Sequence, residues 1–154
     1  MSPRTISDSL VREPPTVSVD DRLETAIRVL LDSDLPAVAV VDRNGRYAGI
    51  FGEREFMSAV FPGYLGDLKG AGFLSRSIDA ALQRRDTCRT EPVSKYMNTE
   101  HIDVGPDYAD MQLAEIFLHH RVLVVPVVDD GTVIGVVTRH GFFTAVAERF
   151  LDQG

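Results

Sequence analysis

The 154-residue chain contains a single cysteine, Cys88, and no tryptophan. One cysteine excludes an internal disulfide framework and a cysteine-based metal cluster. No apolar run approaches the roughly 20 residues that cross a bilayer, and the first residues lack the apolar core of a signal peptide. Basic residues are also few, with 16 Lys and Arg against 23 Asp and Glu and a net charge of −7. That balance argues against a nucleic-acid groove binder, so we expect an acidic, cytoplasmic protein that binds neither nucleic acid nor membrane.

What the chain does contain is an internal repeat. Residues 16–60 align with residues 103–146 at an offset of 87, which becomes 86 after one residue is lost in a turn. The aligned pairs include Val17 and Val104, Asp20 and Asp107, Gly45 and Gly131, Gly49 and Gly135, and, ahead of each copy, Leu10 and Met97. Because a repeat decides the fold, the secondary structure is best considered one copy at a time.

Each copy predicts the same order of elements. A short strand leads to a helix with apolar residues every three or four positions, then to a hairpin of two strands and a closing helix. In the first copy these are 16–19, 23–31, 37–41, a strand ending at 51, and 53–60. In the second copy the strands are 102–104, 124–128 and one ending at 137, and the closing helix runs from 139 to roughly 151. The fold class is therefore α/β (α+β), with two β-α-β-β-α units that pack with pseudo-twofold symmetry, since one unit is too small to bury its apolar face alone.

This repeated order resembles the CBS (cystathionine-β-synthase) domain, of which a tandem pair forms one regulatory module. The resemblance rests on a strand that begins near a proline and ends Val-Val-Asp, a glycine turn, and Gly135-Val136-Val137-Thr138-Arg139-His140 at a helix start. Tyr96-Met97-Asn98 is similar to the Met-Thr start of many CBS repeats. The resemblance places repeat 1 at 8–60, a connector at 61–92 and repeat 2 at 93–150.

The resemblance implies a non-catalytic sensor that binds AMP, ADP or ATP between the repeats, and less often S-adenosylmethionine or NAD. The family pattern Gly-x-x-Thr/Ser-x-x-Asp implies phosphate contacts for the Thr and nearby basic residues, and ribose contacts for the Asp. In repeat 2, Gly141 stands where the pattern has Asp. In repeat 1, Gly52 stands where the pattern has Thr or Ser. The implied ligand-binding residues are Thr138, Arg139, His140, Val104, Val125 and Pro126, together with Glu55, Arg54 and Pro36. Repeat 2 is the expected better site.

Local roles remain open for the same residues. Thr138 precedes a helix, where Thr is a favoured N-cap, and Glu55 stands three residues after Gly52 as a capping glutamate would. The arginines and His140 suit solvated first-turn positions, and the prolines suit strand starts. His119 and His120 end a helix without other ligands at metal spacing, so we expect no metal and no cofactor.

The connector is long for a link between compact units, and it predicts a short helix over 78–85. Its net charge is +1, whereas residues 1–60 carry −3 and residues 93–154 carry −5, which together give −7. One hypothesis is a lid that lends Arg84, Arg85 or Arg89 to a bound anion; the other is a solvated surface excursion.

The helices of both repeats are apolar around much of their circumference, which predicts a homodimer through these helices. A nucleotide sensor that acts in trans on a separate partner protein is the main functional hypothesis. The alternative is a dimerisation or scaffold module with degenerate sites. An enzyme is disfavoured, because no nucleophile–base arrangement, P-loop or catalytic carboxylate pair is recognisable.

Overall fold

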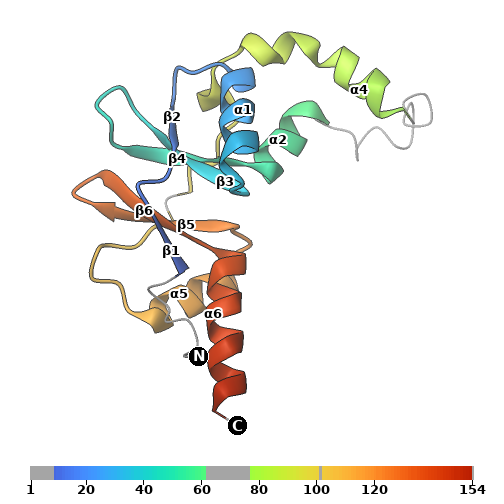
Figure 1. The fold of residues 1–154 in the computed structure, drawn as a ribbon. Helices are drawn as coiled ribbons and strands as arrows, with labels where there is room; N and C mark the ends of the chain where they lie inside the picture. Colours follow the sequence, from blue (N-terminus) through green and yellow to red (C-terminus); the bar gives the residue numbers. More distant parts are fainter. Residues whose placement is uncertain (1–8, 62–76, 101, 154) are drawn as a thin grey trace.

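The computed structural model describes residues 9–61, 77–100 and 102–153 (Figure 1). The first half contains β1 (Leu10–Arg12), β2 (Thr16–Ser18), α1 (Leu23–Ser33), β3 (Ala37–Val41), β4 (Tyr47–Gly52) and α2 (Glu53–Val60). The connector provides α4 (Ile78–Arg84) and η3 (Asp86–Thr90), and η4 (Val93–Lys95) follows at the start of repeat 2. The second half contains α5 (Asp110–His119), β5 (Val124–Asp129), β6 (Thr132–Thr138) and α6 (Arg139–Asp152).

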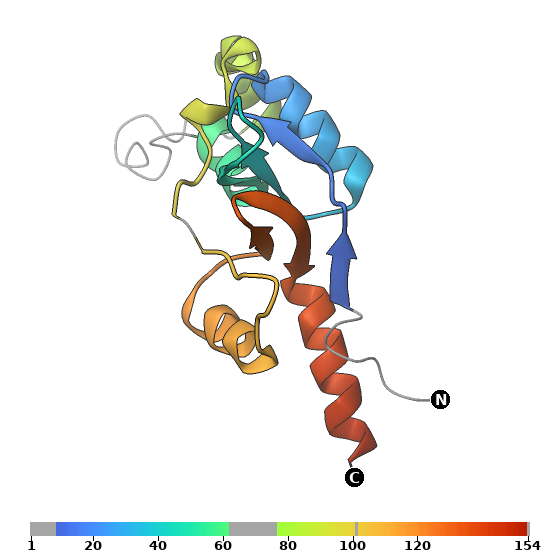
Figure 2. The same cartoon turned by 90° about the vertical axis from the view of Figure 1, so that its left-hand side faces the viewer.

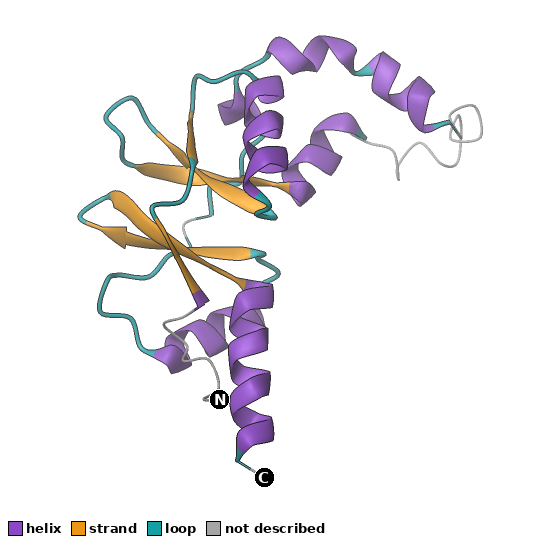
Figure 3. Ribbon diagram, viewed as in Figure 1, coloured by secondary structure: helices purple, strands orange, loops and turns teal. Residues whose placement is uncertain are grey.

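Two three-stranded sheets, β2-β3-β4 and β1-β6-β5, lie one above the other, and each carries its own helices (Figure 3). The strand registers reproduce the alignment of the repeats. Val17 pairs in parallel with Val40, and their counterparts Val104 and Val127 form a parallel bridge. The predicted two-repeat fold with pseudo-twofold symmetry is therefore confirmed, although the strand expected at 102–104 is reduced to that bridge.

The segment ahead of each copy crosses to the sheet of the other copy. Strand β1 pairs antiparallel with β6, where Val11 faces Val136. By the same symmetry Asn98 forms an antiparallel bridge with Ile50 of β4. The two repeats therefore exchange backbone hydrogen bonds: β1 of repeat 1 adds a strand to the sheet of repeat 2, and Asn98 of repeat 2 adds a bridge to the edge strand β4 of repeat 1.

The aligned glycines Gly49 and Gly135 permit this exchange. A Cβ atom on Gly49 would lie 2.6 Å from the carbonyl oxygen of Asn98, and one on Gly135 would lie 2.7 Å from the Leu10 side chain. Both distances are shorter than real Cβ contacts. The repeat thus keeps glycine where the crossing segment approaches the strand.

Each repeat has its own hydrophobic core. In repeat 1 Leu23, Val38 and Phe51 are buried between the helices and the sheet, and in repeat 2 Leu113 and Val125 are buried in the same way. The connector also contributes to the first core, because Cys88 is buried within it, as is Val93 at the start of repeat 2. Most other residues of this second half of the connector are exposed, so it runs over the surface of repeat 1 and is anchored there by buried Ala81 and Cys88; residues 62–76, with Lys69 and Arg76, lie outside the described residues.

Candidate functional site

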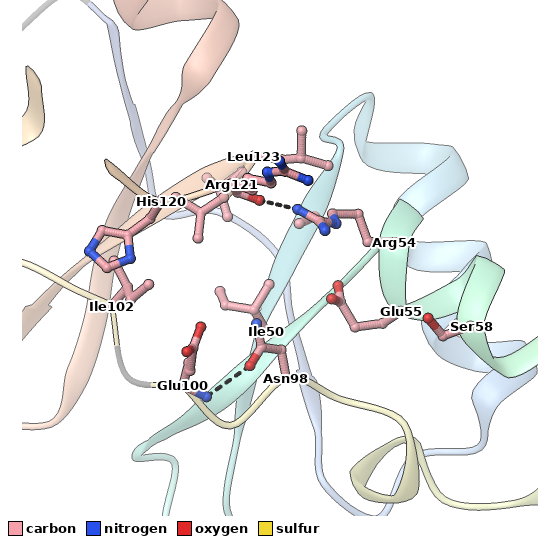
Figure 4. A pocket seen from close by; sticks show the side chains of 13 residues that line it. Ile50, Arg54, Glu55, Ser58, Asn98, Glu100, Ile102, His120, Arg121 and Leu123 are labelled. Atoms are coloured by element: carbon pink, nitrogen blue, oxygen red, sulfur yellow. Dashed lines mark hydrogen bonds between the residues drawn. The ribbon is translucent and has the colours of Figure 1, made fainter. Parts of the chain in front are cut away.

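A cavity of about 330 Å³ lies between the two repeats, where α2 begins and where the chain approaches β5 (Figure 4). Its walls come from three segments that are distant in the sequence. They are the end of β4 with the first two turns of α2, the residues Asn98, Glu100 and Ile102 near the start of repeat 2, and residues 120–124, which lead from α5 into β5. The polar residues that line the cavity are Arg54, Glu55, Ser58, Asn98, Glu100, His120 and Arg121.

Glu55 enters the cavity from the first turn of α2. Its Oε1 accepts a hydrogen bond of 2.9 Å from the backbone N–H of Gly52, the residue before the helix. The predicted capping role is thus observed, because this bond satisfies one of the unpaired N–H groups at the helix start. Burial raises the pKa of the Glu55 carboxyl above its ordinary value, although its backbone hydrogen bonds and Arg54 oppose the shift.

Arg54, the neighbouring residue, reaches across the cavity to the other repeat. Its Nη1 donates a hydrogen bond to the backbone carbonyl oxygen of Arg121, drawn as a dashed line in Figure 4. Arg121 is two residues beyond α5 and three before β5. One side chain of repeat 1 therefore contacts the loop that joins α5 to β5 in repeat 2.

The third wall follows from the strand exchange. Ile50 N–H donates to the Asn98 carbonyl oxygen at 2.9 Å, and Asn98 N–H donates to the Ile50 carbonyl oxygen at 2.8 Å. The Asn98 side-chain oxygen then accepts a bond of 2.9 Å from Glu100 N–H. Glu100 is thereby directed along the cavity wall opposite Arg54 (Figure 4). The cavity joins two arginines and a histidine to two carboxylates, so it offers donors for an anion and acceptors for hydroxyl groups.

The corresponding region of repeat 2 is built differently. Thr138 caps α6, because its Oγ1 accepts a hydrogen bond of 2.9 Å from Gly141 N–H. Arg139 and His140 line an open hollow of about 380 Å³ together with Pro36, Leu123 and Phe143. Gly141 brings no carboxylate to it. The hollow therefore has an arginine and a histidine but no acid equivalent to Glu55.

The two regions remain related by the pseudo-twofold axis. The carbonyl oxygen of Pro36 accepts a bond of 3.0 Å from Glu53 N–H, and the aligned carbonyl of Leu123 accepts one of 2.9 Å from Arg139 N–H. In both cases the chain ahead of one strand meets the start of a helix. Pro36 lines the hollow and is the residue before Ala37, which lines the cavity.

The remaining predicted residues lie in the sheet of repeat 2. Val104 and Val125 are buried in its core, and Val104 N–H donates to the Pro126 carbonyl oxygen at 3.0 Å. None of these three lines the cavity or the hollow. Their backbone positions shape the sheet that supports the loop 120–124.

The connector arginines are engaged elsewhere. Arg85 Nε donates to the Ala59 carbonyl oxygen at 2.9 Å, near the end of α2. Arg89 pairs with Asp86 at 2.7 Å. Neither of them, nor Arg84, lines the cavity. The lid hypothesis therefore has no support from the placement of these three side chains.

Sequence reasoning placed Arg54 and Glu55 at the site but missed Asn98, Glu100, His120 and Arg121. The sequence presents His120 only as a helix-terminal residue or metal ligand. Among the described ranges 9–61, 77–100 and 102–153, no group of three potential ligands is placed to hold a metal ion. No helix within these ranges has the length and apolarity of a membrane span.

Comparison with known protein families gives two matches along the chain. The profile of the CBS domain matches residues 6–62 and again residues 93–148. These ranges correspond to the two copies of the internal repeat and leave out the connector.

Several solved structures of CBS-domain proteins share this fold. The CBS domain of a membrane protein from Sphaerobacter thermophilus is 25% identical, with a TM-score of 0.69 over 92% of this chain and 86% of that chain. CBSX2, a CBS-pair protein from Arabidopsis thaliana, is 18% identical, with a TM-score of 0.71 over 99% of both chains. A structure of CBSX2 in complex with AMP is 19% identical, with a TM-score of 0.67 over 95% of this chain and 98% of that chain.

Among curated proteins, the A-adding tRNA nucleotidyltransferase of Aquifex aeolicus is 38% identical over 58 residues. The match spans 38% of this chain and only 7% of that enzyme. The similarity is thus confined to a segment about as long as one repeat.

Proposed function

Since this chain belongs to the CBS-domain family and carries the domain twice, we propose that it is a non-catalytic regulatory module that binds an adenosine nucleotide. The nucleotide occupies the cavity of about 330 Å³ between the repeats. The observation that carries the proposal is the arrangement around Arg54, which brings a cation, two carboxylates and apolar side chains into one cavity formed by both repeats.

The lining residues match the parts of a nucleotide. Ile50, Ile102 and Val122 provide apolar surface for the base. Arg54 and Arg121 provide positive charge for phosphate, and an arginine makes paired hydrogen bonds to phosphate oxygens.

Glu55 takes the ribose position in this arrangement. Its Oε1 is held by Gly52 N–H, which leaves Oε2 to accept hydrogen bonds from ribose hydroxyls. The cavity volume lies at the low end of the usual range for ligand sites, roughly 300–1,000 Å³, which favours AMP, ADP or ATP over the larger NAD.

The AMP complex of CBSX2 supports the same ligand class, since that protein shares the fold over nearly the whole chain. Binding regulates a separate partner protein by changing the geometry of the repeats. A ligand has this effect only if it binds one arrangement better than the other. The Arg54–Arg121 bond provides the difference, because a phosphate competes with the Arg121 carbonyl for the guanidinium.

Isothermal titration of the full chain with AMP, ATP, S-adenosylmethionine and NAD tests the proposal. We expect saturable binding of AMP or ATP and weaker binding of S-adenosylmethionine and NAD. If none of the four compounds gives a heat of binding at millimolar concentration, the proposed nucleotide site is overturned.

The second candidate function is a dimerisation or scaffold module with degenerate sites. It is favoured by the engagement of Thr138 and Glu55 in helix caps, together with Gly141 at the family's ribose position. Both caps stabilise helices without any ligand. The same titration separates the two candidates, since a scaffold module binds none of the four compounds.

We also propose that the protein is a homodimer through its helices. Leu31 and Met57 are exposed on α1 and α2, and the aligned residues Leu118 and Phe143 are exposed on α5 and α6. Large apolar side chains at symmetry-related surface positions are typical of an interface. Light scattering at micromolar concentration is expected to give twice the 17.0 kDa chain mass, and a monomeric mass would contradict the dimer.

A further inference from the structure

The charged groups that line the cavity between the repeats balance one another. The lining includes two arginines, Arg54 and Arg121, and two glutamates, Glu55 and Glu100. With His120 neutral, the formal charges of these side chains sum to zero. Among the described residues, no lysine and no further arginine lines the cavity. The cavity therefore has cations for one small anionic group and none in addition for a longer chain of phosphates.

Glu100 lies at the rim of this cavity, because it lines the cavity and is exposed. The chain that leaves η4 runs along the edge of the molecule from one repeat to the other (Figure 2), and Asn98 and Glu100 belong to this segment. The segment is fixed to β4, since Asn98 exchanges two backbone hydrogen bonds with Ile50, and the Asn98 side-chain oxygen accepts a third from Glu100 N–H. The backbone that carries the Glu100 carboxylate is thus held against the sheet of repeat 1.

The two arginines lie on the other side of the rim. Both Arg54 and Arg121 are exposed, and the Arg54 guanidinium donates to the Arg121 carbonyl oxygen. Glu100 is on the wall opposite Arg54 (Figure 4). In a cavity of about 330 Å³, a phosphate bound by the arginines faces this carboxylate at short range. Charges repel one another appreciably when they are closer than the Debye length, which is roughly 10 Å at 0.1 M salt.

We propose that Glu100 is a selectivity residue, which makes the site prefer a nucleoside monophosphate to the di- and triphosphates. The inference rests on the proposed nucleotide site and specifies its ligand class. A monophosphate brings about two negative charges to the two arginines, and each added phosphate brings about one more. The added charge meets the Glu100 carboxylate in place of a cation, which is unfavourable. Glu100 therefore selects by repelling the wrong ligand.

Titration calorimetry of the full chain with AMP, ADP and ATP tests the proposal. The titrations are made at pH 8 with EDTA, so that the phosphates are fully ionised and no metal ion joins a phosphate to a carboxylate. Glu100→Gln removes the charge and keeps the size of the side chain. Glu115→Gln is the matched control, because Glu115 is an exposed glutamate on α5 that does not line the cavity. The quantity compared is the ratio of the Kd for ATP to the Kd for AMP, since a variant that only disturbs the fold changes both constants together.

We expect the native chain to bind AMP more tightly than ADP, and ADP more tightly than ATP. Glu100→Gln is expected to lower the ratio of the two Kd values about threefold or more, and Glu115→Gln to leave it unchanged. An unchanged ratio in Glu100→Gln, or equal affinity of the native chain for AMP and ATP, overturns the selectivity role and leaves the nucleotide site in place. If none of the three nucleotides binds, the selectivity role and the proposed function are both overturned.

Discussion

The guanidinium of Arg54 donates a hydrogen bond to the backbone carbonyl oxygen of Arg121, and this bond spans the cavity between the repeats. The same side chain is available to a phosphate, since Arg54 is exposed at the start of α2. Arg54 thus links the proposed ligand to the loop that joins α5 and β5.

Replacing Arg54 with alanine is expected to weaken AMP binding at least tenfold. A hydrogen bond to a charged group contributes about 1.5–3 kcal/mol, and about 1.4 kcal/mol corresponds to a factor of ten. Titration calorimetry measures the change. Arg28→Ala is the matched control, because Arg28 is an exposed arginine on α1 that does not line the cavity. Equal affinity in the two variants would remove Arg54 from the site.

Glu55 predicts a pH-dependent stability. Burial raises the pKa of Glu55 in the folded chain. Folding therefore takes up a proton at pH values between the unfolded pKa, near 4.5, and the higher folded pKa. The carboxyl's contribution to the free energy of unfolding falls as the pH rises through that window and is constant above it. Glu55→Gln is uncharged and keeps an acceptor for Gly52 N–H.

The stability of the native chain relative to Glu55→Gln is therefore expected to decrease from about pH 4 towards neutral pH. Urea unfolding at a series of pH values measures both proteins, and the difference cancels the titration of the other groups. A difference that is constant, or that rises with pH, would show that the Glu55 carboxyl is not raised in pKa.

Thr138 is expected to affect stability and leave nucleotide affinity unchanged. Thr138→Ala removes the acceptor for Gly141 N–H, and losing such a cap costs about 1 kcal/mol. Thr138→Ser retains the hydroxyl and serves as the control. Urea unfolding and AMP titration are read together, and a loss of affinity in Thr138→Ala would place the ligand in repeat 2 instead.

Gly49→Ala is expected to destabilise the fold by about 1–3 kcal/mol, the usual cost of an inserted methyl group in a packed site. The new Cβ would lie 2.6 Å from the Asn98 carbonyl oxygen and would displace the segment that crosses from repeat 2. Gly105→Ala is the control, because no atom lies within 4 Å of its added Cβ. Equal midpoints of urea unfolding in the two variants would contradict the close crossing.

The repeated elements were predictable because each has its own periodicity or turn signal. The hairpin glycines Gly45 and Gly131 adopt positive φ values of 79° and 83°, as a tight turn requires. Helix α2 has the predicted bounds, and α6 ends one residue beyond its expected end. These features depend on local sequence.

The strand exchange and the cavity were not predictable in the same way. Strand β1 has three residues, too few for a periodic pattern, and its partner β6 is more than a hundred residues away. Arg121 and Glu100 lie in loops whose positions depend on how the repeats pack. One signal was present: the alignment of Leu10 with Met97, ahead of the two copies, marks the segments that cross.

The most direct test of a nucleotide site at the start of α2 is an amide NMR titration of the full chain with AMP. We expect the largest shift changes in the three walls of the cavity: residues 50–58, residues 98, 100 and 102, and residues 120–124. The amides of residues 139–141, at the start of α6, should change little. Changes concentrated at α6, or no saturable change anywhere, would contradict the account.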